Sequence, residues 1–210
     1  MPVSSLSNFT VPLSSGQSSS AQGLLMPKLK FRFRVTLTKF GVAGTASTEL
    51  TKQVMNVTRP EISFEEIKLP VYNSTIKLAG KHSFADIKLT LRDDVSNAVS
   101  NKVAEQMQKQ FDFFEQASAA SGIDYKFTTI IEILDGGNGA TAVGVLETFQ
   151  LDGCWIKQVT YQGGDYSSAT DPLDIALSIC YDNAMQMDGS GNASGLGENI
   201  GRTVRTLALG

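Results

Sequence analysis

The chain has 210 residues, of which 41% are hydrophobic and 19% charged, a composition that suits one domain with a buried core. Its net charge is −3 and its pI about 5.2, so the chain lacks the excess of basic residues with which tight nucleic-acid binders neutralise phosphates. No secretion-type leader precedes the charged residues and no apolar run nears the about 20 residues that cross a bilayer, so we expect a protein made and kept in a cytoplasm, without membrane insertion.

The first 27 residues are rich in serine, carry no charged side chain and include three prolines. Such a segment cannot build a core of its own, so we predict an extended N-terminal arm that becomes ordered by lying against a neighbouring molecule. Its spaced apolar residues are the expected anchors: Val3, Leu6, Phe9, Val11, Leu13, Leu24 and Leu25.

Apolar and polar residues then alternate in "KFRFRVTLTKF". The alternation predicts a strand with one apolar face, Phe31, Phe33, Val35 and Leu37, and one polar face, Arg32, Arg34, Thr36 and Thr38. The same period of two recurs in "QVMNVT", "EISFEEIKL", "STIKLA", "FADIKLTLR", "YKFTTIIEIL", "VGVLETFQL", "CWIKQVTY" and "LDIALSICY". The pattern predicts a domain dominated by β-strands.

One segment has helical spacing instead. Val95, Val99 and Val103 begin a stripe that continues to Phe114, with Asp94 at the expected start, so we predict one amphipathic helix over residues 94–120. Its apolar stripe is typical of a core-facing helix.

The polar residues that could support chemistry do not converge. Glu65 and Glu66 are adjacent in a predicted strand and therefore point to opposite faces, and His82 lacks a neighbouring acid and nucleophile. Cys154 and Cys180 are expected to be buried thiols without a disulfide, and one histidine with two cysteines makes a zinc site improbable.

The glycine-rich stretches "DGGNGAT" and "GSGNASGLGENIG" lack the Lys-Ser/Thr ending of a phosphate-binding loop. A hairpin turn over residues 135–139 is the expected structure of the first. We therefore predict no catalytic residue, cofactor or metal, and a protein that is not an enzyme.

Charge is distributed unevenly along the chain. Lysines and arginines precede the first acid at Glu49, whereas residues 158–201 carry only acids. We expect Arg32 and Arg34 to lie near Asp174 or Asp182, within a subunit or across an interface, because opposite charges across strands attract.

The order of elements resembles the tail tube proteins of contractile-tailed bacteriophages, over about residues 28–185. The features that carry the resemblance are the strand from Glu66 to Pro70, "STIKLAG" ending at Gly80, Phe84 before Asp86, the acidic pair Asp93–Asp94, "FQLDGCWI" and "ALSICYDNA". The tube protein of type VI secretion is similar in fold. A tube of a type VI-like or other contractile injection system therefore remains the alternative.

The resemblance implies a mainly β (α+β) fold, barrel- or sandwich-like, with one amphipathic helix and with subunit sheets that join into a ring-wide barrel. It implies an N-terminal arm over 1–27, a tube domain over 28–185 and a glycine-rich C-terminal arm over 186–210. The rings, typically hexameric, would stack into the inner conduit for DNA ejection inside a contractile sheath.

The partners implied are further copies of the chain, the tail sheath, tape measure, baseplate and tail terminator proteins, and passing DNA that is not bound tightly. The location implied is the virion tail, assembled in the host cytoplasm. The lumen should be lined by polar strand faces on which acids and small polar groups balance or exceed lysines, because lysines would hold phosphates. The candidates are Lys77, Asp86, Lys88, Thr128 and Glu132.

Overall fold

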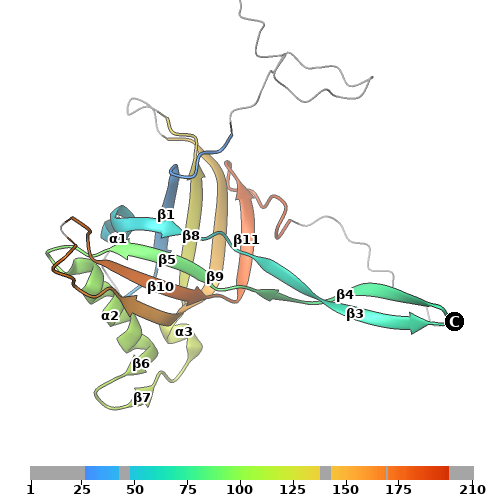
Figure 1. Ribbon diagram of the computed structural model, residues 1–210, viewed down its shortest axis with the longest axis horizontal. Coiled ribbons are helices and arrows are strands. Elements are labelled where there is room, and N and C mark those ends of the chain that lie inside the picture. The colour runs from blue at the N-terminus through green and yellow to red at the C-terminus, as the bar shows by residue number, and fades with distance from the viewer. Residues whose placement is uncertain (1–26, 43–47, 138–142, 169, 199–210) are drawn as a thin grey trace, which may run out of the picture. The chain divides into compact units, whose positions relative to one another are not determined.

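Strands dominate the part of the chain that the computed structural model describes, which is residues 27–42, 48–137, 143–168 and 170–198 (Figure 1). The chain divides into two units, residues 1–32 and 33–210. In the first, the backbone N–H of Arg32 donates to the carbonyl oxygen of Leu29, and its guanidinium lies over the Phe31 ring. The predicted anchors between Val3 and Leu25 lie outside the described residues.

The second unit contains all of the helices and strands that the structure describes. In chain order they are β1 (Phe33–Thr38), α1 (Thr48–Gln53), β2 (Val54–Val57), β3 (Ile62–Val71), β4 (Ser74–Phe84), β5 (Ile87–Arg92), α2 (Ala98–Gln110), β6 (Phe111–Asp112), β7 (Ala117–Ser118), α3 (Gly122–Tyr125), β8 (Phe127–Leu134), β9 (Val145–Tyr161), β10 (Asp174–Cys180) and β11 (Asn183–Asp188). Every strand pair is antiparallel.

One seven-stranded sheet has the order β1-β8-β9-β10-β5-β2, with β11 also paired to β9. Strand β9 is long enough to belong to two parts of this sheet: Glu147 to Asp152 pair with β11, and Trp155 to Tyr161 pair with β10. Gly153 lies between the two parts with a positive φ of 70°. The sheet therefore changes its neighbours at a residue whose backbone favours glycine.

Alternation places the apolar residues of these strands on one buried face. Phe127, Ile131 and Leu151 are fully buried there, as are Leu89 and Leu177 on the other part of the sheet. Helices α1 and α2 close this core with Leu50, Val99 and Val103. The face predicted for the first strand is confirmed for Val35 and Leu37, although the strand begins at Phe33 and Phe31 precedes it.

The helix predicted over 94–120 is shorter at both ends. Its N-cap is Asn97, with a φ of 55°, and Asp94 instead accepts hydrogen bonds from Ser96 and from the backbone N–H of Val99. At the other end Phe111 is extended, and the carboxylate of Asp112 accepts from the N–H groups of Phe114 and Glu115. A tight turn between β6 and β7 thus replaces the expected last turns of the helix.

Strand β11 crosses the predicted boundary between residues 185 and 186 and pairs with β9, so the first residues of the predicted C-terminal arm belong to the sheet. The remainder of the predicted C-terminal arm is described only as far as residue 198. The turn predicted at 135–139 lies partly outside the described residues; on either side of it β8 and β9 pair antiparallel, and the N–H of Asp135 donates to Gly144 O at 3.0 Å.

Candidate functional site

Four strand segments, β1, β8, the first part of β9, and β11, present a mostly polar face on the side away from the core. We call it the polar face. Cross-strand register assigns its members, since residues paired across antiparallel strands share a side. They are Arg34, Thr36, Thr38, Thr128, Ile130, Glu132, Thr148, Gln150, Asp152, Asn183, Met185 and Met187.

The charged groups of the polar face are held by neighbours on the same face. The Arg34 Nε lies 2.5 Å from Glu132 Oε2, and this hydrogen bond raises the pKa of Arg34. Asp152 Oδ1 accepts from the Thr128 hydroxyl at 3.3 Å and from the Gln150 amide at 3.1 Å. The face carries two acids and one arginine, and no lysine occupies any of its positions.

The seven-stranded sheet has edges at which no further strand is paired. Among the described residues, no strand pairs with the second side of β1 or of β2. The second side of β11 is covered in part by the segment 192–196, which returns alongside it: the N–H of Ser194 donates to Gln186 O at 2.9 Å. An unpaired strand edge offers a row of backbone donors and acceptors to another chain.

Strands β3 and β4 form a separate two-stranded hairpin that extends beyond the seven-stranded sheet (Figure 1). The register pairs Ile67 with Leu78 and Leu69 with Ile76, so that branched apolar side chains collect on one face. Each is 44% to 49% exposed: Ile67, Leu69, Val71, Ile76 and Leu78. We call this set the hairpin apolar face, and no described element covers it.

The opposite face of the hairpin is charged. Glu66 Oε1 lies 2.8 Å from Lys77 Nζ, and Glu66 Oε2 lies 3.5 Å from Lys68 Nζ. The end of the hairpin next to the sheet is held by aromatic contacts. The ring centroids of His82 and Phe84 lie 5.2 Å apart, and those of Phe84 and the buried Tyr181 lie 5.1 Å apart. His82 is therefore part of a structural contact, and Glu66 part of an ion-pair group.

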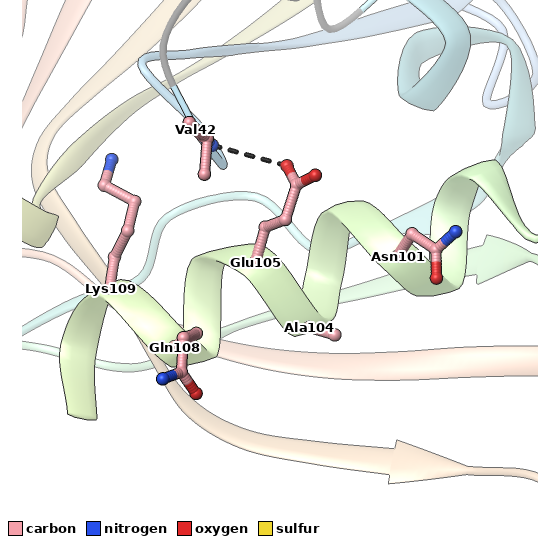
Figure 2. A pocket seen from close by; sticks show the side chains of 6 residues that line it. All are labelled: Val42, Asn101, Ala104, Glu105, Gln108 and Lys109. Carbon is pink, nitrogen blue, oxygen red and sulfur yellow. Dashed lines mark hydrogen bonds between the residues drawn. The ribbon is translucent and has the colours of Figure 1, made fainter. Parts of the chain in front are cut away.

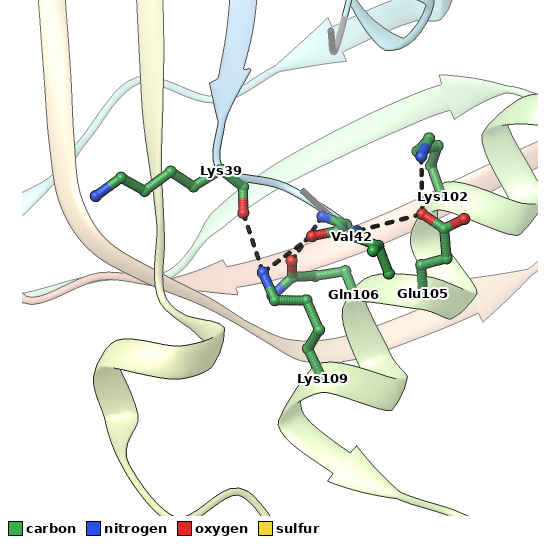
Figure 3. Close-up of polar contacts among 7 residues, drawn as sticks. Lys39, Val42, Lys102, Glu105, Gln106 and Lys109 are labelled. Atoms are coloured by element: carbon green, nitrogen blue, oxygen red, sulfur yellow. Dashed lines mark hydrogen bonds and ion pairs between the residues drawn. The ribbon is translucent and has the colours of Figure 1, made fainter. Parts of the chain in front are cut away.

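An open groove of about 540 Å³ runs along α2 (Figure 2). Both charged residues in its lining are engaged: Glu105 accepts from the N–H of Val42 and from Lys102, and the Lys109 ammonium donates to the carbonyls of Lys39 and Gly41 (Figure 3). These bonds hold the segment after β1 against the helix. The groove therefore offers no free acid–base pair for catalysis.

The predicted pairing of Arg34 with Asp174 or Asp182 does not occur within the chain. Arg34 pairs with Glu132, and Asp182 forms an ion pair with Lys126. Asp174 is the register partner of Arg92 on β5. Complementarity between these residues stays a prediction for contacts between copies, and so does any role of Arg32.

The five predicted lumen residues do not share one surface. Thr128 and Glu132 belong to the polar face, whereas Lys88 is exposed on β5 and Asp86, just before it, pairs with Lys157 at 2.6 Å. Lys77 lies on the hairpin, bound to Glu66. Alternation places Thr128, Glu132 and Lys88 on the sides of their strands away from the core, but whether two strands are neighbours depends on their pairing, and the lumen contact of all five residues stays a prediction.

Both cysteines are free thiols; Cys154 is buried as predicted, whereas Cys180 is only partly buried. Burial raises the pKa of Cys154 to about 11, so it stays protonated and unreactive at neutral pH. In the described ranges, no three His, Cys, Asp or Glu side chains are placed to hold a metal ion. Nor is any helix of these ranges long and apolar enough to cross a membrane.

The fold is that of the tube-like proteins of contractile injection systems. A chain of the anti-feeding prophage cap, described as a tube-terminating cap, matches with a TM-score of 0.58 and 14% identity, covering 82% of this chain and 99% of that one. A chain of the sheath-tube complex of an extracellular contractile injection system, PVC, matches with a TM-score of 0.54 and 14% identity, covering 77% and 92%. At such identities the likeness shows the fold alone.

The sequence itself matches no protein-family model and no curated protein. The predicted resemblance and the mainly β tube-like fold are confirmed by the structural comparison. The first of these matched structures is described as a tube-terminating cap and the second as a sheath-tube complex. The ring-wide barrel stays a prediction.

Proposed function

We propose that the chain is the tube subunit of a contractile apparatus, and that its copies close into rings, typically of six, that stack into a hollow tube. The observation that carries this proposal is the uncovered hairpin apolar face. A two-stranded hairpin is marginal by itself in water, and a contiguous apolar surface marks an interaction site. In the proposed contact the hairpin apolar face of one copy packs on a different surface of the next, and such head-to-tail contacts give rings or filaments.

The polar face is the proposed wall of the lumen. Its two acids and one arginine are interspersed with threonines and amides, which supports transit of a polyanion without retention. Thr128 and Glu132 remain lumen candidates on this basis. Asp86, Lys88 and Lys77 would contact the lumen only if the second part of the sheet and the hairpin also face it.

In the phage form of the proposal, the tube belongs to a virion tail that assembles in the host cytoplasm and ejects DNA. Its partners would be the sheath, tape measure, baseplate and tail terminator. The alternative is the tube of a secretion-type or extracellular injection system. The neighbours described as an anti-feeding prophage cap and a PVC sheath-tube complex favour that second candidate. Capsid genes beside the coding sequence would distinguish the phage form.

The test is electron microscopy of the purified protein. We expect hollow tubes, and isolated monomers at high concentration would contradict the proposal. The double variant Leu69→Ser/Leu78→Ser removes two members of the hairpin apolar face without disturbing the core, since both are exposed in the monomer. It should stay folded and form no tubes. A matched control, Thr75→Ser on the charged face of the same hairpin, should assemble normally.

A further inference from the structure

The four strand segments that carry the polar face form a unit with two ends, β1 and β11. Consecutive pairs are antiparallel, so β11 runs opposite to β1. If β1 of a second copy lay beside β11, the antiparallel order would continue without interruption from one subunit to the next. The two edges also match in length, because each strand has six residues.

One of these two edges is already occupied in the isolated chain. Besides the Ser194 bond, the N–H of Gln186 donates to Leu196 O at 2.8 Å, and the N–H of Asp188 donates to Asn192 O at 2.9 Å. Met187 and Ala193 form an antiparallel bridge. Residues 192–196, which we call the edge cover, thus use the outward-facing backbone groups of β11 that a neighbouring strand would need.

The edge cover is attached to β11 mainly by these backbone bonds, together with a bond from the Asn192 N–H to Asp188 Oδ1 at 2.9 Å. Residues 192–195 are exposed, and Leu196 is the member that packs, half-buried, against the core. Gly195 and Gly197 adopt φ values of 82° and 92°, which favour glycine and leave the segment few conformations in common with a regular strand. A segment with few apolar contacts and exposed backbone bonds opens at low free-energy cost.

We infer that the edge cover occupies, in the free subunit, the site on β11 that receives β1 of a second copy, and that it leaves this site when the ring closes. The inference rests on the proposed tube function and names the strand contact within it. In the free subunit the cover protects an edge that would otherwise pair without control. When β1 replaces the edge cover, the short irregular pairing between β11 and residues 192–196 gives way to a regular strand pairing between β11 and β1.

A reversible cross-link tests the inference. Met187 and Ala193 are opposite each other between two ladder bonds, the non-hydrogen-bonded type of pair, whose Cα atoms lie about 4.5 Å apart, within disulfide range. The variant Met187→Cys/Ala193→Cys, made in a Cys180→Ser background, should form tubes when kept reduced and form none when it is oxidised as a free subunit before assembly. The single-cysteine variants, treated identically, are the matched controls and should assemble in both states.

Tubes from the oxidised double variant would overturn the inference while leaving the tube function intact. If the Cys180→Ser parent and the wild type form no tubes in any state, the proposed function fails and this inference with it. Hydrogen exchange of the wild-type chain gives a second readout. The Ser194 amide should be protected in the monomer and exchange in tubes, whereas those of Gln186 and Asp188 stay protected in both. Continued protection of Ser194 in tubes would also contradict the inference.

Discussion

Gly153 is the residue at which β9 passes from one part of the sheet to the other. Its φ of 70° disfavours any side chain, and a Cβ built there would lie 2.2 Å from Asp182 Oδ2. Asp182 is the ion-pair partner of Lys126. Glycine is therefore required at position 153 for two reasons, the positive φ of its backbone and the nearby Asp182 carboxylate.

Gly153→Ala should lower the free energy of unfolding by about 2 kcal/mol or more, from the left-handed backbone and the displaced carboxylate. Denaturant unfolding measures the loss. The control is Gly163→Ala, where a Cβ meets no atom within 4 Å. Equal stability of the two variants would show that Gly153 is not constrained in solution.

The side chain of Gln110 makes the two backbone hydrogen bonds that a neighbouring strand would otherwise make to Ile156. Its side-chain amide donates to Ile156 O at 2.9 Å and accepts from Ile156 N–H at 2.8 Å, at the point on β9 beyond its pairing with β8. The amide side chain satisfies both backbone groups of one residue. Helix α2 is thereby tied to the sheet by polar contacts as well as by its valines.

Gln110→Leu should destabilise the fold by about 2 kcal/mol, because it leaves two partly buried backbone groups without partners. Thermal unfolding measures the change. Asn101→Ala, an exposed position near the start of the same helix, is the control and should be neutral or slightly stabilising. A Gln110→Leu variant as stable as the wild type would mean that water replaces the amide.

At the scale of elements, the proposed assembly predicts its largest effect at the hairpin, whose apolar face is uncovered in the described chain. Tyr72 at its tip is fully exposed, with a φ of 44°. Chymotrypsin should cut the monomer after Tyr72 and leave the sheet folded, because the hairpin contributes little to the core. In tubes this cut should slow strongly relative to cleavage after Tyr166, an exposed loop site that serves as the internal reference. Equal protection of both sites would argue against burial of the hairpin between copies.

Alternation alone predicted most strands and their buried sides, since each residue's side is a local property of a strand. It failed where local preference was overridden. Phe111 and Phe114 keep helical spacing, yet the helix ends before them, and the Asp112 carboxylate accepts hydrogen bonds from the backbone N–H groups of Phe114 and Glu115. Strand β11 was missed because "NAMQMD" has no strong β-formers and becomes a strand by pairing with β9.

The assembly surface was less predictable than the fold. Whether Thr128, Lys88 and Lys77 share a wall depends on which strands are neighbours, a non-local fact that no single segment contains. The edge cover has no sequence signal beyond Gly195 and the glycines that flank it, and such glycines predict a flexible arm equally well. Its position became visible only from the backbone bonds to β11.

At the scale of the whole molecule, the distribution of charge bears on transit through the proposed lumen. The formal net charge is −3, and the polar face itself carries no lysine. Thr36 lies in the middle of β1 on this face, opposite Ile130. A lysine there would leave the buried side of β1 unchanged and place one added positive charge per subunit on the wall.

Tubes of Thr36→Lys should therefore retain short duplex DNA at low salt and release it as salt rises, because phosphate binding by lysines is lost with increasing ionic strength. Co-sedimentation of labelled DNA with preformed tubes measures the retention, and wild-type tubes should retain little. Gly163→Lys adds the same charge at a loop position that is exposed in the described structure, and is the matched control. If it retains as much DNA as Thr36→Lys, binding follows total charge rather than the wall. If neither variant retains DNA, the polar face does not line a passage open to DNA.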